Sequence, residues 1–132
     1  VQTNTYPFEE ADVVPAIQQF LDIYEATGTD IDPTSLGVQA FSAGLLFANA
    51  ATAASAGEEG LTRDTLWAEL KATTEWDGGG LHPMNSPGTN EGSGCFLYMR
   101  VEEGAFVRAY PEEPGTFECS KTELVDVSAV GS

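Results

Sequence analysis

The two cysteines of this chain, Cys95 and Cys119, constrain its fold more than any other feature, because most of the segment between them is a predicted β-hairpin. Residues 95–110 are rich in aromatic and β-branched residues, which favour strands. At the centre of this segment, Glu103-Gly104 suits a two-residue turn, because glycine tolerates positive φ. We therefore expect two antiparallel strands between the cysteines.

The turn fixes the pairing of the two strands by placing Glu102 opposite Ala105. One face then carries the pairs Val101–Phe106, Met99–Arg108 and Leu97–Tyr110, and the other carries Phe96, Tyr98, Arg100 and Val107. Both faces are largely apolar. We therefore expect both to be covered by other parts of the molecule.

A disulfide between Cys95 and Cys119 is geometrically reasonable, because the Pro- and Gly-containing link at 111–117 suits a turn back toward the hairpin. In the chain-entropy model it stabilises the fold by about 3.5 kcal/mol. The alternative is two buried free thiols. A reactive or metal-binding cysteine is disfavoured, because neither cysteine has a second thiol at short spacing and the only histidine, His82, is distant in sequence. A disulfide indicates a location outside the reducing cytosol.

The first half of the chain predicts a short strand at 1–5 followed by two helices. The first helix has Asp12 as N-cap and Pro15 in its first turn, and it ends at Gly28. We expect it to cover a sheet through one apolar stripe, made of Val14, Ile17, Leu21 and Tyr24. The second helix should begin with Asp32-Pro33 as N-cap and first residue, and its many small residues allow close packing.

A third helix is predicted after Gly60. Thr62 is its N-cap, Leu61 and Leu66 fit a hydrophobic staple, and Leu66, Trp67 and Leu70 form the expected buried stripe. A long Gly- and Pro-rich connection then leads from residue 76 to residue 94. The resulting three-stranded sheet is small for three helices, so part of the sheet is expected to lie outside this sequence.

The charge of the chain excludes some classes of partner. With 21 acidic and 5 basic residues the net charge is −16, and the Lys and Arg clusters that bind nucleic acid or anionic membranes are absent. No calcium-loop motif is present, and we expect no metal and no cofactor. The uncharged run at 33–56 is long enough for a membrane span, but its polar residues favour a helix buried on most sides in a soluble protein.

No motif indicates an enzyme. His82 is the only candidate base and lies in a Gly- and Pro-rich loop, where we expect a turn residue. Gly78-Gly79-Gly80 follows a helix and has no lysine, so we expect a bend of the backbone there instead of a phosphate loop. The start of the second helix, Thr34 to Phe41, is the best candidate site, because amide donors at a helix N-terminus can hold a carboxylate. The alternative is that Thr34 and Ser35 cap the helix and Phe41 belongs to the core.

Several runs in this order resemble the C-terminal part of type I periplasmic solute-binding proteins of ABC importers, in the leucine/isoleucine/valine-binding branch. They are SLGVQAFSAGLLFANAA from Ser35, LTRDTLWAEL from Leu61, GGGLHP from Gly78, and the hairpin from Cys95 with its closing Phe117-Glu-Cys119. The resemblance implies an α/β fold of two lobes, of which this chain is a C-terminal fragment with three helices, a short strand and a C-terminal β-hairpin.

The resemblance also implies a division of the chain. Residues 1–8 end the second-lobe sheet and cross between lobes, residues 9–88 form first-lobe helices, and residues 89–132 return to the second lobe as hairpin and tail. The region that matches Ser35 to Phe41 borders the ligand cleft in that family. The ligand-binding residues it suggests are Ser35, Val38, Gln39 and Phe41.

The expected function is therefore capture of a small solute, such as a branched-chain amino acid or an amide, for a membrane permease. The expected location is extracellular or in the cell envelope, as a secreted lipoprotein in the intact form. The alternative is a stand-alone secreted structural or interaction domain with no small-molecule ligand. Because a fragment of this kind leaves apolar helix surface without a partner, self-association is also expected.

Overall fold

The computed structural model describes residues 1–119 of the chain. Its elements are β1 (Gln2–Thr3), the 3-10 helix η1 (Phe8–Glu10), α1 (Pro15–Ala26), α2 (Ser35–Ala56), α3 (Arg63–Ala72), the 3-10 helix η2 (Pro87–Thr89), β2 (Leu97–Glu102) and β3 (Ala105–Tyr110). The strands form one antiparallel sheet in the order β1-β2-β3. The predicted mixed composition of three helices, a short strand and a hairpin is confirmed. The last predicted segment spans residues 89–132, and its residues 120–132 lie outside the residues that the structure describes.

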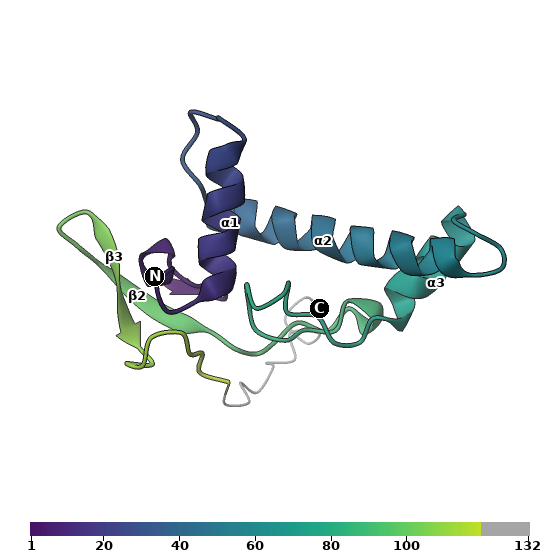
Figure 1. Ribbon diagram of the computed structural model, residues 1–132. Helices are drawn as coiled ribbons and strands as arrows, with labels where there is room; N and C mark the ends of the chain where they lie inside the picture. The colour runs from purple at the N-terminus through teal and green to yellow at the C-terminus, as the bar shows by residue number, and fades with distance from the viewer. Residues whose placement is uncertain (120–132) are drawn as a thin grey trace, which may run out of the picture.

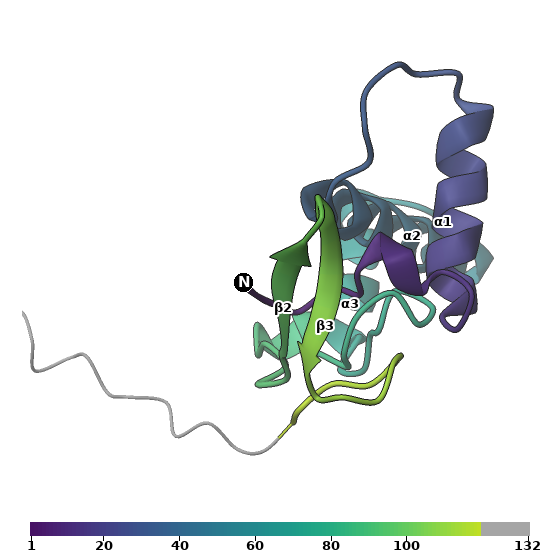
Figure 2. The same ribbon diagram turned by 90° about the vertical axis from the view of Figure 1, so that its left-hand side faces the viewer.

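Helix α2 forms the long axis of the molecule (Figure 1). At its N-terminal end lie α1 and the sheet, and at its C-terminal end the chain turns back so that α3 packs beside α2. Viewed along α2, the hairpin and α1 lie on different sides of the N-terminal end of that helix (Figure 2). The two ends of α2 therefore have different neighbours.

The hydrophobic core lies where α1 meets the first turns of α2. Its buried members are Val14, Ile17, Phe20, Val38 and Leu81. The Phe20 ring contacts the rings of Phe8 and Phe41 at centroid distances of 6.0 and 5.5 Å. No strand residue belongs to this cluster, so the expectation that the first helix covers a sheet is wrong: α1 covers α2 and the Gly-rich connection instead.

Two predicted helix starts are displaced. The residue before α1 is Val14, which makes no side-chain cap, and Pro15 is the first helical residue, so Asp12 is not the cap. Helix α2 begins at Ser35 after Thr34, whose Oγ1 accepts a hydrogen bond from the Gly37 N–H at 3.1 Å. The predicted cap at Asp32 is therefore wrong by two residues, and the threonine satisfies the free amide in its place.

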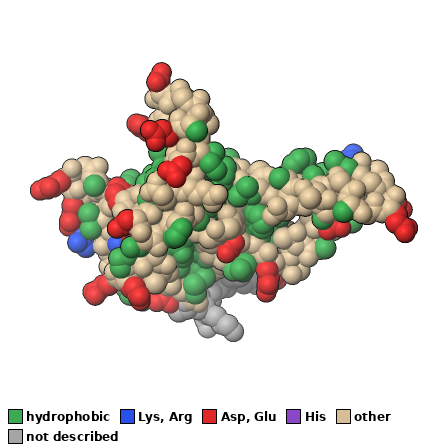
Figure 3. Space-filling view, in the orientation of Figure 1, with side chains coloured by type: hydrophobic (Ala, Val, Ile, Leu, Met, Phe, Trp, Pro, Cys, Tyr) green, Lys and Arg blue, Asp and Glu red, His purple; other side chains and the backbone are tan. Residues whose placement is uncertain are grey.

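Helix α2 is not buried on most sides, contrary to the sequence-based expectation. Only 17% of its most apolar window is buried, and Leu36 and Phe47 are exposed. The helix is covered near Val38 and Ser42 by the core and near its other end by α3, but among residues 1–119 its remaining face has no neighbour. Hydrophobic side chains are visible along this helix in Figure 3. By length and composition alone, α2 also meets the requirements of a membrane-spanning helix.

Helix α3 has the predicted cap but not the predicted burial. Thr62 Oγ1 accepts from the Thr65 N–H at 3.1 Å, and Thr65 Oγ1 accepts from the Thr62 N–H at 2.9 Å. No residue of α3 is fully buried, and Trp67 is 59% exposed. The predicted buried stripe is therefore wrong: Leu66 and Leu70 are half-buried, and the main elements of residues 1–119 that pack against α3 are α2 and η2.

The hairpin keeps the predicted register from Glu102–Ala105 to Met99–Arg108. A bulge then shifts the pairing, so Tyr110 lies opposite Tyr98 instead of Leu97. The turn residues Glu103 and Gly104 both have positive φ, as a two-residue hairpin turn requires. The expectation that both faces are covered is wrong, since four of their large side chains are 43–62% exposed: Tyr98, Val101, Phe106 and Tyr110.

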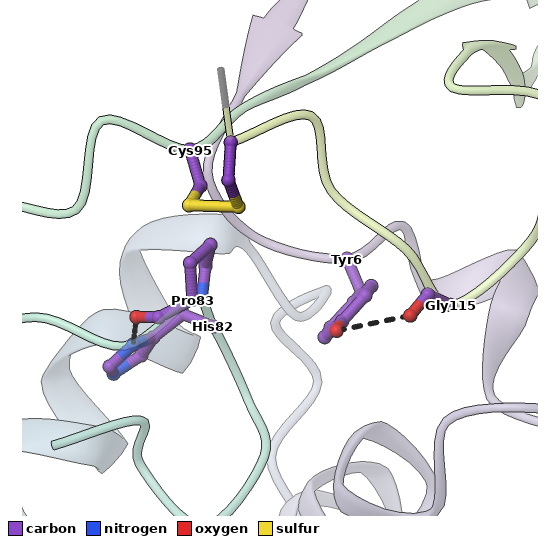
Figure 4. The surroundings of a disulfide bond; sticks show 6 residues. Tyr6, His82, Pro83, Cys95 and Gly115 are labelled. Carbon is purple, nitrogen blue, oxygen red and sulfur yellow. Dashed lines mark hydrogen bonds between the residues drawn. A yellow bond between two sulfur atoms is a disulfide. The ribbon is translucent and has the colours of Figure 1, made fainter. Parts of the chain in front are cut away.

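The predicted disulfide between Cys95 and Cys119 is confirmed (Figure 4). Beside it, Phe96 and Glu118 exchange two backbone hydrogen bonds of 2.9 Å, which hold the returning chain against the start of the hairpin. A disulfide of this kind is typical of proteins in an oxidising compartment.

Candidate functional site

A cavity of about 420 Å³ lies between the start of α2 and the sheet. Residues distant in sequence line it: the first strand and the segment after it, the residues around the N-cap of α2, and the hairpin. Its lining residues are Val1, Gln2, Thr3, Thr5, Tyr6, Pro7, Phe8, Glu9, Pro33, Thr34, Ser35, Met99 and Phe106. Most of these are apolar, so the cavity suits the hydrocarbon part of a small ligand.

The N-terminus of α2 supplies polar groups to this cavity. The N-cap Thr34 accepts from Gly37, and the Val38 N–H donates to the Thr34 carbonyl at 3.1 Å. Within residues 1–119, the N–H groups of Ser35 and Leu36 have no hydrogen-bond acceptor. Free donors and the positive end of the helix dipole favour an anionic or carbonyl group. The start of α2 can therefore hold the polar end of a ligand whose apolar part fills the cavity.

The four predicted ligand-binding residues separate into two groups. Ser35 lines the large cavity, and Gln39 lines a second cavity of about 310 Å³ on the next turn of α2. Val38 is fully buried, and the ring of Phe41 packs against that of Phe20, so both belong to the core. The structure thus brings Ser35 and Gln39 to cavities but places Val38 and Phe41 behind them.

The second cavity is more polar than the first. It is lined by Asn4, Thr5, Gln39, Ser42, Ala43, Leu46, Trp76, His82, Asn85 and Pro87. Thr5 lines both cavities, so the two are neighbours. Sequence reasoning missed Thr5, Trp76 and Asn85, because no local motif marks them and they meet α2 only through the tertiary fold.

A hydrogen-bond network at Ser42 fixes the wall of the second cavity. The Trp76 Nε1–H donates to Ser42 Oγ at 2.9 Å, and Ser42 Oγ lies 2.7 Å from His82 Nε2. His82 Nδ1 lies 2.9 Å from the Pro83 carbonyl, which can only accept, so Nδ1 carries the proton and Nε2 accepts from the serine. A Cβ atom on Gly78 would lie 2.7 Å from Ser42 Oγ, so the loop packs tightly here.

The serine–histidine contact joins the loop to α2 and has the distance of a nucleophile–base pair. Ser42 is only 4% exposed, however, and His82 is oriented by a backbone carbonyl, whereas the Ser-His-Asp triad uses a carboxylate. Gly78, Gly79 and Gly80 all have positive φ, as expected for the predicted bend. The contact of His82 with Ser42 anchors the connection to α2.

Two acidic residues of η1 join the wall of the large cavity to the hairpin. Glu9 Oε1 accepts from the Phe106 N–H at 2.9 Å. Glu10 forms a buried ion pair with Arg108, with contacts of 2.5 Å from Nε and 2.6 Å from Nη2. Glu10 also accepts from the Gly115 N–H at 3.0 Å. These bonds hold the segment between β1 and α1 against β3. We call it the crossing segment.

Tyr6 completes this side of the cavity. Its hydroxyl donates to the Gly115 carbonyl at 3.3 Å (Figure 4). Its ring also contacts that of Phe117, at a centroid distance of 4.4 Å. Burial raises the pKa of the Tyr6 phenol, and the nearby Arg108 guanidinium opposes that shift. The crossing segment is thus held next to the disulfide-linked end of the hairpin.

Within residues 1–119, no group of three or more His, Cys, Asp or Glu side chains is arranged to hold a metal ion. Comparison with protein families, with curated proteins and with solved structures found no match to this chain. The functional argument therefore depends on the two cavities and on the residues that line them.

Proposed function

We propose that this chain is the C-terminal part of an extracellular solute-binding protein with the two-lobed type I periplasmic fold. It would capture a small solute, such as a branched-chain amino acid or an amide, and deliver it to the permease of an ABC importer. The observation that carries the proposal is the large cavity at the start of α2. Its walls come from segments that the family resemblance assigns to different lobes, and a ligand held between two lobes needs such walls.

The chemistry of the cavity agrees with a small solute that has one polar and one apolar end. Ser35 lines the cavity, and its N–H group, which has no acceptor in residues 1–119, suits a carboxylate or an amide carbonyl. Phe8, Met99 and Phe106 provide apolar surface for a branched side chain. The polar cavity beside Gln39 shares Thr5 with the large cavity and extends the site.

The incomplete cover of α2 supports a larger protein. Exposing one face of a 22-residue apolar helix to water costs free energy. The sheet formed by residues 1–119 has three strands, one of them two residues long. Further strands of a first lobe would cover this face. The disulfide agrees with a secreted protein, which would be a lipoprotein in its intact form.

The test uses the product of the complete reading frame that contains this chain. Thermal shift and calorimetry with valine, leucine, isoleucine and propionamide should show stabilisation that grows as RT ln(1 + [L]/Kd). Ser35→Glu should abolish binding of the amino acids, because its carboxylate repels theirs, while a glutamate in the first helical turn preserves the helix. Ser35→Gln is the control of similar size without charge.

Either of two results would contradict the proposal. If no small amino acid or amide stabilises the complete protein, the solute-binding function is refuted. If Ser35→Glu and Ser35→Gln have the same effect on amino-acid affinity, the ligand carboxylate does not lie at the start of α2.

The alternative function is a stand-alone secreted domain, and gel filtration of the 132-residue chain distinguishes the two. The exposed face of α2 predicts association that increases with concentration, and Phe47→Ser should reduce it. A strictly monomeric, cooperatively folded chain would favour the stand-alone domain.

A further inference from the structure

Helix α3 carries a surface that the solute-binding proposal does not use. Arg63, Trp67 and Lys71 are spaced four residues apart, so their side chains follow one face of the helix. All three are exposed, and Trp67 is 59% exposed. This surface belongs to α3, which lies at the other end of α2 from the hairpin (Figure 1). We call it the α3 stripe.

The cations of the stripe are unusual in so acidic a chain. The described residues contain four basic side chains. Arg108 pairs with Glu10 and Arg100 pairs with Glu102, whereas Arg63 and Lys71 form no ion pair or hydrogen bond with any side chain of residues 1–119. The two basic side chains of residues 1–119 that form no ion pair thus flank the same exposed tryptophan.

The tryptophan separates two shallow hollows. The first, of about 360 Å³, is lined by Arg63, Asp64, Leu66, Trp67 and Leu70. The second, of about 350 Å³, is lined by Trp67, Leu70, Lys71, Pro87, Gly88 and Asn90. The second contains a cation and no acidic residue, so it is the more favourable of the two for a carboxylate.

The second hollow has a fixed floor. The Gly88 N–H donates to the Thr73 carbonyl at 2.8 Å, and a Cβ atom on Gly88 would lie 2.1 Å from the Lys71 carbonyl oxygen. The loop therefore packs directly against the end of α3. Lys71 Nζ lies 5.4 Å from the centre of the Trp67 ring, which holds the cation beside the aromatic surface. A preformed aromatic and cationic surface loses little entropy on binding.

We propose that the α3 stripe binds a short acidic segment of a partner protein, with an apolar side chain of that segment packed against Trp67. Charge complementarity selects this partner, because Arg63 and Lys71 lack carboxylates within the described chain. An exposed tryptophan flanked by basic residues has the composition of a binding hot spot. Carboxylates of the partner would pair with the two cations at either end of the stripe.

The test is fluorescence anisotropy with a labelled peptide that alternates acidic and apolar residues, acetyl-Asp-Leu-Glu-Phe-Asp-Leu-Glu-amide. Trp67→Ala should weaken binding by at least about tenfold. Arg63→Gln and Lys71→Gln should each weaken it by about two- to fivefold and reduce its salt dependence. Arg100→Gln changes the net charge equally at a distant, already paired site and serves as the control. Circular dichroism confirms that each variant folds.

Four results would overturn the proposal. The first is no binding of the peptide at about 1 mM, the Kd of a very weak complex. The second is equally tight binding of a peptide that has lysine in place of its acidic residues. Phosphatidylglycerol vesicles that bind through the same residues would indicate a membrane surface. Peptide binding that appears only after truncation behind Cys119 would show that the chain's own end occupies the stripe.

Discussion

The ion pair between Glu10 and Arg108 should be the polar interaction on which the fold depends most. Both side chains are nearly buried, with exposures of 10% and 6%. Beyond their two mutual contacts, Glu10 accepts from Gly115, and Arg108 Nη1 donates to the Thr116 carbonyl at 2.8 Å. One carboxylate therefore connects η1, β3 and the link that leads to the disulfide.

Replacing Glu10 by Gln keeps the size of the side chain but leaves a buried guanidinium without its counter-charge. Breaking a buried pair in this way costs about 3–5 kcal/mol. Because glutamine still offers one acceptor, we expect the free energy of unfolding to fall by about 3 kcal/mol. For a domain of this size that corresponds to a decrease in Tm of about 10 °C.

Urea denaturation followed by circular dichroism measures the effect as a change in midpoint at constant m. The matched control is Glu102→Gln, which removes the carboxylate of an ion pair that is more than half exposed and should cost less than about 1 kcal/mol. The double variant Glu10→Gln/Arg108→Gln should cost less than the sum of the single changes. Equal losses for Glu10→Gln and Glu102→Gln would refute the reasoning, because burial would then make no difference.

Three further predictions concern the same framework. Reduction of the disulfide should lower the free energy of unfolding by about 3.5 kcal/mol at most, measured by urea denaturation with and without reductant. Gly88→Ala should lower the free energy of unfolding by more than about 2 kcal/mol, because the added Cβ meets the Lys71 carbonyl. The control Gly92→Ala, whose Cβ would have no atom within 4 Å, should change the free energy of unfolding by less than about 0.5 kcal/mol. Since burial raises the pKa of Tyr6, the contribution of this phenol to folding stability should be constant below about pH 10 and fall as pH rises further; thermal melts of Tyr6→Phe above pH 10 should show a smaller fall.

The features predicted correctly from sequence are those set by neighbours along the chain. Glu103-Gly104 determines the hairpin turn and its first pairs, and Thr62 satisfies the free amides of its own helix. The cap of α2 was misplaced because Asp32 and Thr34 both fit the local rules and differ little in free energy. The burial of Val38 in the core fixes the start of the helix, and that contact is not visible in the local sequence.

The candidate site was only partly predictable for the same reason. Ser35 and Gln39 follow from the position of a helix start, but the walls opposite them come from both ends of the chain. The contact between Ser42 and His82 joins residues 40 positions apart, and no periodicity marks it. Burial along α3 was overestimated, because an apolar stripe indicates a helix but does not show that a second surface is present to cover it.

The hydrogen bonds around the large cavity are concentrated on one of its two walls, and this affects how a ligand could bind between them. Glu9, Glu10 and Tyr6 fix the crossing segment to β3 and to the link behind it. On the opposite wall, the N–H groups at the start of α2 have no acceptor in residues 1–119, and the hydrogen bonds of Thr34 stay within the helix. A ligand that accepts from these amides while its apolar part contacts Met99 and Phe106 would therefore supply a direct connection between the two walls. Its binding should protect the first turn of α2 from amide hydrogen exchange more than the hairpin, which is already paired.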